Sequence, residues 1–223
     1  MAPPTVAKVG YTFGMYDYTS DEFLYDQGFV TTGFPSGTGP KADSRNNRSH
    51  YGYVGVEHNF NPVMSFGASG GVQYTEFYND PLSDDTLTPY GELSFTYLYT
   101  TASSIQVGYL LSQQATDVLD PATNGQVTQN RLASSLWGRI SHQFFPQFKG
   151  SLFGQWQLSQ YNGGSADGQE DNLFLFGANL RYEFNRFLSA DLGYSFDYLD
   201  SPIPSRGGGY TRNRVFLGMS AKY

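Results

Sequence analysis

Apolar and polar residues alternate with a period of two along most of the chain. In the first such segment, residues 5–18, Val9 and Tyr11 share one face. Lys8 and Thr12 share the other face. Successive side chains of a β-strand point to opposite faces, so this period predicts strands and not helices. The pattern recurs in ten segments, each longer than the five or six residues typical of a soluble strand: 5–18, 48–60, 64–77, 88–99, 105–116, 127–144, 148–161, 171–184, 188–199 and 210–223.

Short and long connections alternate between these segments. The short ones predict tight turns, near the three-residue length common in hairpins, at residues 61–63, 100–104, 145–147 and 185–187. The long ones are polar and rich in Gly, Pro, Asp and Asn, at residues 19–47, 78–87, 117–126, 162–170 and 200–209. All short turns therefore lie at one end of an up-and-down meander and all long loops at the other. The same count of residues places Phe60 opposite Met64, Tyr99 opposite Ile105, Phe144 opposite Phe148 and Phe184 opposite Leu188.

The two faces of the predicted sheet differ in chemistry. One carries large aliphatic and aromatic residues and, between the strand ends, almost no charge. The other is rich in Gly, Ser, Thr, Gln and Asn, as the lining of a narrow lumen requires. The charged residues of this polar face form the candidate pore lining: Lys8, Glu57, Glu92, Arg131, Arg139, Lys149, Arg181, Glu183, Asp191, Asp197, Arg214 and Lys222.

Strands of about ten residues, apolar outside and polar inside, suit a transmembrane β-barrel. Closing the sheet leaves no unpaired edge in hydrocarbon. Aromatic residues near both strand ends fit two interfacial girdles. We therefore expect an all-β fold, with residues 1–223 forming a single transmembrane up-and-down antiparallel barrel of ten strands. Its short turns and both termini would be periplasmic and its long loops extracellular. The alternative is a soluble β-sandwich with an unusually polar core.

The composition narrows the class further. Aromatic residues make up 17% of the chain, too many for a disordered protein. The absence of Cys excludes thiolate metal sites and disulfide scaffolds. A net charge of −7 argues against binding to nucleic acid, which needs a basic surface. The residues that begin the chain, Met-Ala-Pro-Pro, lack the basic and apolar parts of a secretory signal, as expected where a leader has been removed.

The segments 50–81, 144–164 and 210–223 resemble the outer-membrane proteins grouped as the putative β-barrel porin family. The similarity runs from about residue 48 to the end, and the Thr211-Arg212-Asn213-Arg214 sequence is among its most specific features. It implies the outer membrane of Gram-negative bacteria, with membrane lipid and lipopolysaccharide as surroundings. Members are usually longer, with more strands, and the chain matches their C-terminal part. It is a natural small barrel, a domain of a longer protein or an engineered truncation.

The last strand resembles the signal that the barrel-assembly machinery reads during insertion. Gly218, Met219, Ala221 and Tyr223 have the spacing of such a strand, and the chain ends on an aromatic residue. Ala221 is smaller than that pattern prefers. The resemblance implies the assembly machinery as a transient partner.

Two readings of the polar face remain open. The register places Arg181 opposite Asp191 and Gln143 opposite Lys149. An excess of basic over acidic residues would make a weakly anion-preferring pore. Alternatively, the charges form a network that blocks the lumen. Blockage is favoured by the inward aromatic residues Tyr51, Tyr53, Trp137, Phe153 and Phe216.

The long-loop end is acidic, with few basic residues nearby. Asp80, Asp84 and Asp85 supply enough oxygen ligands for Ca²⁺ in principle, which could bridge the loops to lipopolysaccharide. The simpler reading is solubilising charge on exposed loops. Loop 19–47 is the longest, and loops of such length tend to be functional or disordered.

The sequence gives no catalytic constellation and implies no cofactor. His50, His58 and His142 are the only histidines, and no Ser-His-acid, phosphate-loop or zinc-type spacing accompanies them. We therefore predict a non-enzymatic, porin-like barrel, small or partly occluded, for small polar solutes or ions. The alternative is a non-conducting structural or adhesive barrel, or an engineered scaffold, acting through its acidic loops. The oligomeric state is left open.

Overall fold

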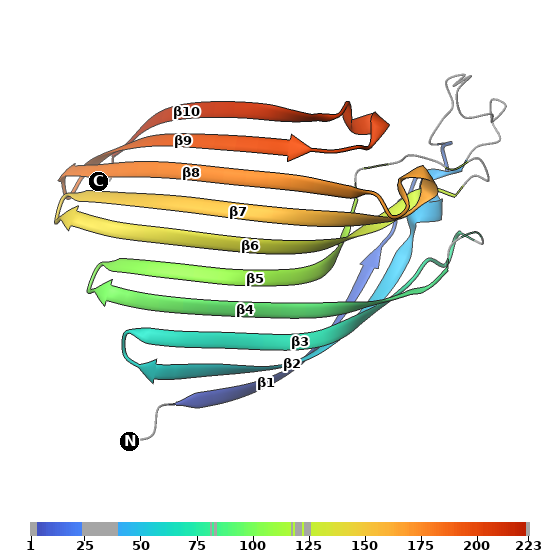
Figure 1. Ribbon diagram of the computed structural model, residues 1–223, viewed down its shortest axis with the longest axis horizontal. Helices are drawn as coiled ribbons and strands as arrows, with labels where there is room; N and C mark the ends of the chain where they lie inside the picture. The colour runs from blue at the N-terminus through green and yellow to red at the C-terminus, as the bar shows by residue number, and fades with distance from the viewer. Residues whose placement is uncertain are drawn as a thin grey trace.

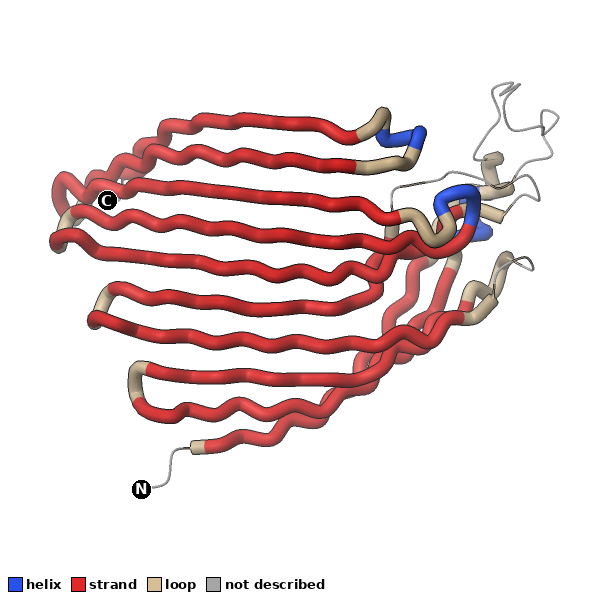
Figure 2. The backbone as a smooth tube through the Cα atoms, in the orientation of Figure 1, coloured by secondary structure: helices blue, strands red, loops and turns tan. Residues whose placement is uncertain are grey.

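The protein folds into one antiparallel sheet of ten strands (Figure 1). The structure, a computed structural model, describes residues 4–23, 40–80, 82, 84–116, 118, 122 and 126–221. Three short 3-10 helices, η1 (Ala42–Arg45), η2 (Gly164–Ala166) and η3 (Pro204–Arg206), lie in the long connections (Figure 2). The strands are β1 (Thr5–Tyr16), β2 (Asn47–Asn61), β3 (Met64–Glu76), β4 (Thr86–Thr100), β5 (Ser103–Ala115), β6 (Thr128–Phe145), β7 (Phe148–Gly163), β8 (Glu170–Asn185), β9 (Leu188–Asp200) and β10 (Gly209–Ala221).

Each strand pairs with the next one along the chain, in the order β1 to β10. The tight turns gather at one end of the sheet and the long connections at the other, as Figure 1 shows. The predicted up-and-down antiparallel meander of ten strands is therefore confirmed. None of the helices in the described part of the chain is long and apolar enough to cross a bilayer.

The predicted register holds at three of the four tight hairpins. In β2–β3, β6–β7 and β8–β9 the pairs Asn59–Ser65, Gln143–Lys149 and Arg181–Asp191 lie opposite each other as counted. Each of these hairpins shifts register by one residue just before its turn. Met64, Phe148 and Leu188 therefore lie opposite Asn61, Phe145 and Asn185, and not opposite Phe60, Phe144 and Phe184 as predicted.

The fourth hairpin, β4–β5, differs from the prediction. Ile105 lies opposite Tyr97 instead of Tyr99, because Thr100 already pairs with Ser103 and the turn is tighter than the sequence suggested. A shift of two residues leaves every side chain on its predicted face.

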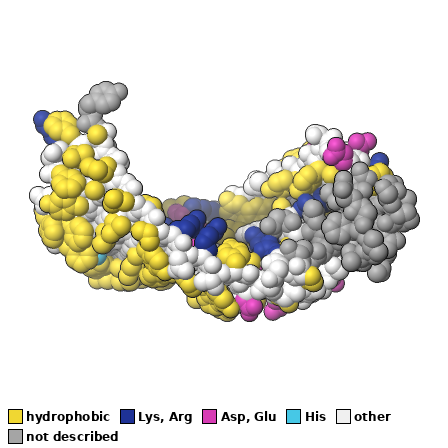
Figure 3. Space-filling model, turned by 90° about the horizontal axis from the view of Figure 1, so that it is seen from above, with side chains coloured by type: hydrophobic (Ala, Val, Ile, Leu, Met, Phe, Trp, Pro, Cys, Tyr) yellow, Lys and Arg dark blue, Asp and Glu magenta, His cyan; other side chains and the backbone are white. Residues whose placement is uncertain are grey.

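The two faces of the sheet have the predicted chemistry. Val54, Leu136 and Leu192 on the apolar face have exposed fractions of 63%, 53% and 47%, although all three lie in the middle of strands. Figure 3 shows hydrophobic side chains on the outer wall, whereas Lys and Arg side chains lie within the hollow. A soluble sandwich would cover the apolar face with a second sheet. Here no second sheet covers the apolar face among the described residues. A large exposed apolar surface of this kind suits contact with the hydrocarbon of a lipid bilayer.

The sheet is curved into an open trough in Figure 3. Within the described residues, β1 pairs only with β2 and β10 only with β9. With ten strands, β1 and β10 run in opposite directions, so antiparallel pairing between them is geometrically allowed. The architecture is consistent with a ten-stranded barrel, whose seam would join these two edges.

Candidate functional site

The predicted pore-lining residues that the structure describes lie on the polar, concave face of the sheet. On the wall formed by β1, β2 and β4, Lys8 Nζ donates to Glu57 Oε1. Glu92 accepts a hydrogen bond of 2.8 Å from the hydroxyl of Tyr90. Lys8, Glu57 and Glu92 line a common cavity of about 300 Å³. The alternation of the three strands therefore brings these charges to one surface.

Arg181 is the centre of a second charged group, on β8 and β9. Its Nη1 lies 3.7 Å from Asp191 Oδ1, and its Nε lies 3.7 Å from Glu183 Oε1. Its Nη2 also donates to Ser189 Oγ at 3.1 Å. The predicted pairing of Arg181 with Asp191 is thus confirmed. Lys149 on β7 lies opposite Arg181 in the register.

A third group joins β9 and β10. Asp197 is 3% exposed, and its Oδ2 accepts hydrogen bonds from Arg212 Nε at 2.8 Å and Arg214 Nη2 at 3.0 Å. Arg212 is absent from the predicted pore lining, although it lies two residues from Arg214 and on the same face. Alternation along the strand places Arg212 on the polar face, so the sequence alone was sufficient to add it to the predicted pore lining. Two arginines therefore neutralise one buried carboxylate.

Three predicted cations remain outside these groups. Arg131 Nη2 donates to Gln114 Oε1 at 3.2 Å, and Arg139 lies 5.5 Å from the centroid of the Phe153 ring. In the described part of the chain, Arg131, Arg139 and Lys149 form no ion pair, and Glu92 is the only predicted pore-lining acid without one. Lys222 lies outside the described residues, as does Tyr223 of the proposed assembly signal. The polar face therefore presents more unpaired positive than negative charge.

Several inward aromatic rings lie along the wall of the sheet. Tyr53 on β2 is opposite Gly10 on β1, and its ring occupies the space that a Cβ at Gly10 would need. Phe216 on β10 covers Gly193 on β9 in the same way. A ring laid over a neighbouring glycine takes little of the lumen. This arrangement weakens the reading in which inward aromatic residues block it.

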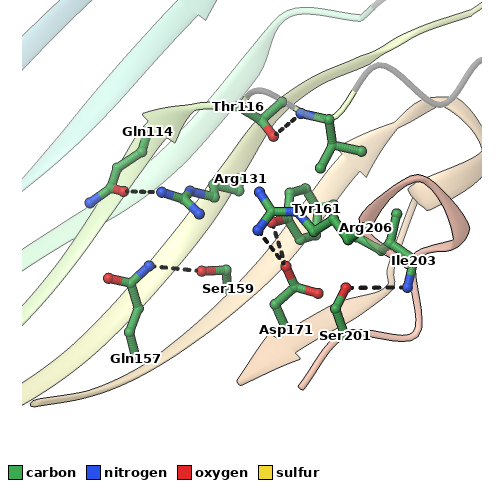
Figure 4. Close-up of polar contacts among 11 residues, drawn as sticks. Gln114, Thr116, Arg131, Gln157, Ser159, Tyr161, Asp171, Ser201, Ile203 and Arg206 are labelled. Carbon is green, nitrogen blue, oxygen red and sulfur yellow. Dashed lines mark hydrogen bonds and ion pairs between the residues drawn. The ribbon is translucent and has the colours of Figure 1, made fainter. Parts of the chain in front are cut away.

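A buried network of polar contacts joins β7, β8 and the connection 200–209 at the long-loop end (Figure 4). Asp171 on β8 is 2% exposed and accepts a hydrogen bond of 2.7 Å from the hydroxyl of Tyr161 on β7. Arg206 Nη1, from η3 in the last long connection, lies 3.4 Å from the same Asp171 oxygen. Ile203 from that connection is fully buried, in a cluster with Tyr161, Val118 and Ala166. The connection 200–209 is therefore anchored onto the sheet by one charge and one apolar side chain.

The candidate metal ligands do not come together. Asp80 Oδ2 accepts from Gln129 Nε2 at 2.8 Å, and Asp85 Oδ2 accepts from the hydroxyl of Tyr74 at 2.5 Å. Among the described residues, no group of three or more His, Asp or Glu is placed to hold a metal ion. Asp80, Asp84 and Asp85 are thus not gathered into a cluster in the described part of the chain, where Asp80 and Asp85 accept hydrogen bonds from side chains of different strands.

The sequence that forms these strands matches the model of one protein family. The sequence profile of the family described as putative beta-barrel porin 2 aligns with residues 43–223, well over half of the chain. The chain belongs to this family. The resemblance stated from the sequence is confirmed, and the match begins at η1 and covers β2 to the C-terminus. A search of curated proteins gives no match.

Proposed function

We propose that this member of the porin family is an outer-membrane channel that passes small polar solutes and ions with a weak preference for anions. The strands have 12 to 18 residues, more than the roughly 9–11 that a tilted strand needs to cross a bilayer. The exposed apolar face supports membrane insertion, and the polar face supports an aqueous lumen. The observation that carries the anion preference is the set of unpaired cations Arg131, Arg139 and Lys149 on that face.

The charge balance follows from the ion pairs. Lys8, Arg181, Arg212 and Arg214 each have a carboxylate partner, so their fields are largely neutralised locally. Among the described residues of the polar face, three cations without an ion pair against one such acid, Glu92, give a net positive potential along the lumen. A lining of one sign raises the local concentration of counter-ions and sets the selectivity of a pore.

The test is planar-bilayer conductance of the detergent-folded protein, first in symmetric salt and then in a salt gradient. We expect discrete steps and a reversal potential on the anion side. The double variant Arg139→Gln with Lys149→Gln moves the reversal potential toward cations. Arg186→Gln, in the turn between β8 and β9, is the single-charge control outside the lumen. Absence of conductance from protein that has inserted into the bilayer contradicts the proposed channel function.

The second candidate function is a non-conducting barrel that acts through its loops. The observation that favours it is the anchored connection 200–209, in which Arg206 and Ile203 pack against the sheet next to Tyr161. A loop held this firmly suits a binding platform as well as a pore rim. Absence of conductance together with retention of the folded barrel would favour this function.

A further inference from the structure

A cavity of about 390 Å³ opens on the concave face at the long-loop end, between β1–β3 and β5–β6. Within the described residues, its lining contains no Asp, Glu, Lys, Arg or His, although the surrounding loops are acidic. A charged solute would lose hydration there without gaining a partner of opposite charge. The lining instead holds six carboxamide side chains, those of Asn47, Gln73, Gln113, Gln114, Gln129 and Asn130.

Neighbouring groups hold these carboxamides in place. Gln114 Oε1 accepts from Arg131 at 3.2 Å, and Gln73 Nε2 donates to Thr75 Oγ1 at 3.3 Å. A carboxamide offers two donor and two acceptor positions, so Gln73 and Gln114 retain capacity for a further partner. Groups that are already oriented lose less entropy when a ligand binds. The cavity thus presents fixed donors and acceptors and no net charge.

The cavity also has a rigid aromatic wall. Tyr51, which lines the cavity, stacks on Tyr53 with ring centroids 5.2 Å apart and forms a T-shaped contact with Tyr90 at 4.7 Å. Phe77, on the loop side, is only 5% exposed. Aromatic faces supply apolar contact area in fixed orientations. A ring-shaped solute could therefore place its C–H groups against the part of Tyr51 that lines the cavity while its polar groups reach the carboxamides.

We infer that this cavity binds a neutral, hydroxyl-rich solute of monosaccharide or disaccharide size. A hydroxyl both donates and accepts, as a carboxamide does, so the two match without charge. The volume lies near the lower end of the roughly 300–1,000 Å³ of ligand pockets. The inference rests on the proposed function, because it names a class of solute for the channel.

The test is titration calorimetry of the detergent-folded protein with maltose, sucrose and trehalose, and with gluconate as a charged polyol. We expect saturable binding of at least one disaccharide and none of gluconate. Gln73→Ala combined with Gln114→Ala weakens that binding about tenfold or more, because hydrogen-bond partners are lost. Gln106→Ala is the matched control, since Gln106 lies on the same face of β5 opposite Arg139, outside the cavity.

Two results overturn the inference: no heat with any of the three disaccharides from folded protein, or unchanged affinity in the double variant. Conductance separates this failure from failure of the channel. If the barrel conducts but binds no disaccharide, the proposed channel stands and the proposed binding site is wrong. If the barrel binds a disaccharide but shows no conductance, the binding site stands and the proposed channel is wrong.

Discussion

The indole of Trp137 on β6 lies over Gly108 on β5, its partner in the register. A Cβ placed at Gly108 would lie 2.5 Å from the Trp137 ring. The glycine therefore lets the largest side chain of the polar face rest against the wall of the sheet. The rings of Tyr53 and Phe216 are accommodated by glycines in the same way.

Gly108→Ala is expected to push the Trp137 ring into the lumen. Overpacking of this kind costs about 1–3 kcal/mol of unfolding free energy, and the displaced ring lowers single-channel conductance. Urea unfolding in lipid vesicles and bilayer recording measure the two effects. Gly154→Ala serves as control, since nothing lies within 4 Å of a Cβ there. Equal behaviour of both variants would show that the ring has room to move.

Leu136→Arg tests whether the apolar face meets lipid. Leu136 lies on that face in the middle of β6, and an arginine in the hydrocarbon core of a barrel costs about 2–4 kcal/mol. Gln155→Arg places the same charge on the polar face of β7 and is expected to cost little. Folding yield into vesicles and urea unfolding distinguish the two. A larger loss of unfolding free energy for Gln155→Arg than for Leu136→Arg would reverse the assignment of the two faces.

Asp197→Asn removes the carboxylate that Arg212 and Arg214 share. Arg212 and Arg214, both partly exposed, then lack this counter-charge. We expect the free energy of unfolding to fall by about 1–3 kcal/mol. The freed positive charge also moves the reversal potential further toward anions. Asp191→Asn is the milder comparison, because its contact with Arg181 is longer, at 3.7 Å. A reversal potential that does not move would place Asp197 away from the conduction path.

Asp171→Asn weakens the attachment of the connection 200–209. The buried asparagine still accepts from Tyr161 but gives Arg206 no counter-charge. We expect faster cleavage of this connection by added protease, while the barrel fragments remain folded. Asp167→Asn is the control, since the Asp167 side chain accepts from the amide of Gly163, in a different loop. Cleavage that stays unchanged would mean that apolar packing of Ile203 is sufficient.

The absence of Cys allows a direct test of barrel closure. Thr12→Cys on β1 is combined in turn with Phe216→Cys, Gly218→Cys and Ser220→Cys on the same face of β10. Closure within one chain predicts that one of these pairs forms a disulfide inside a monomer, because bridged Cα atoms must lie within about 7 Å. Disulfide-linked dimers in all three would indicate instead that the edges pair between copies.

Much of the fold follows from the sequence alone, because a strand in a two-faced sheet has a side-chain period of two. Counting in twos placed Arg181 opposite Asp191 and assigned Val54 and Leu136 to the apolar face. The same counting would have included Arg212 beside Arg214. These are local relationships, since neighbouring strands are joined by turns of known length.

Only the tertiary structure decided what the long connections and ring orientations do. Arg206 reaches Asp171, and Asp80 binds Gln129, across distances in sequence for which no period exists. The tighter β4–β5 turn, which set Tyr97 opposite Ile105, depends on pairing at Thr100 that alternation cannot detect. Whether Tyr53 fills the lumen or lies on Gly10 depends on a side-chain rotation. Alternation fixes the face of a residue, whereas packing fixes where its atoms go.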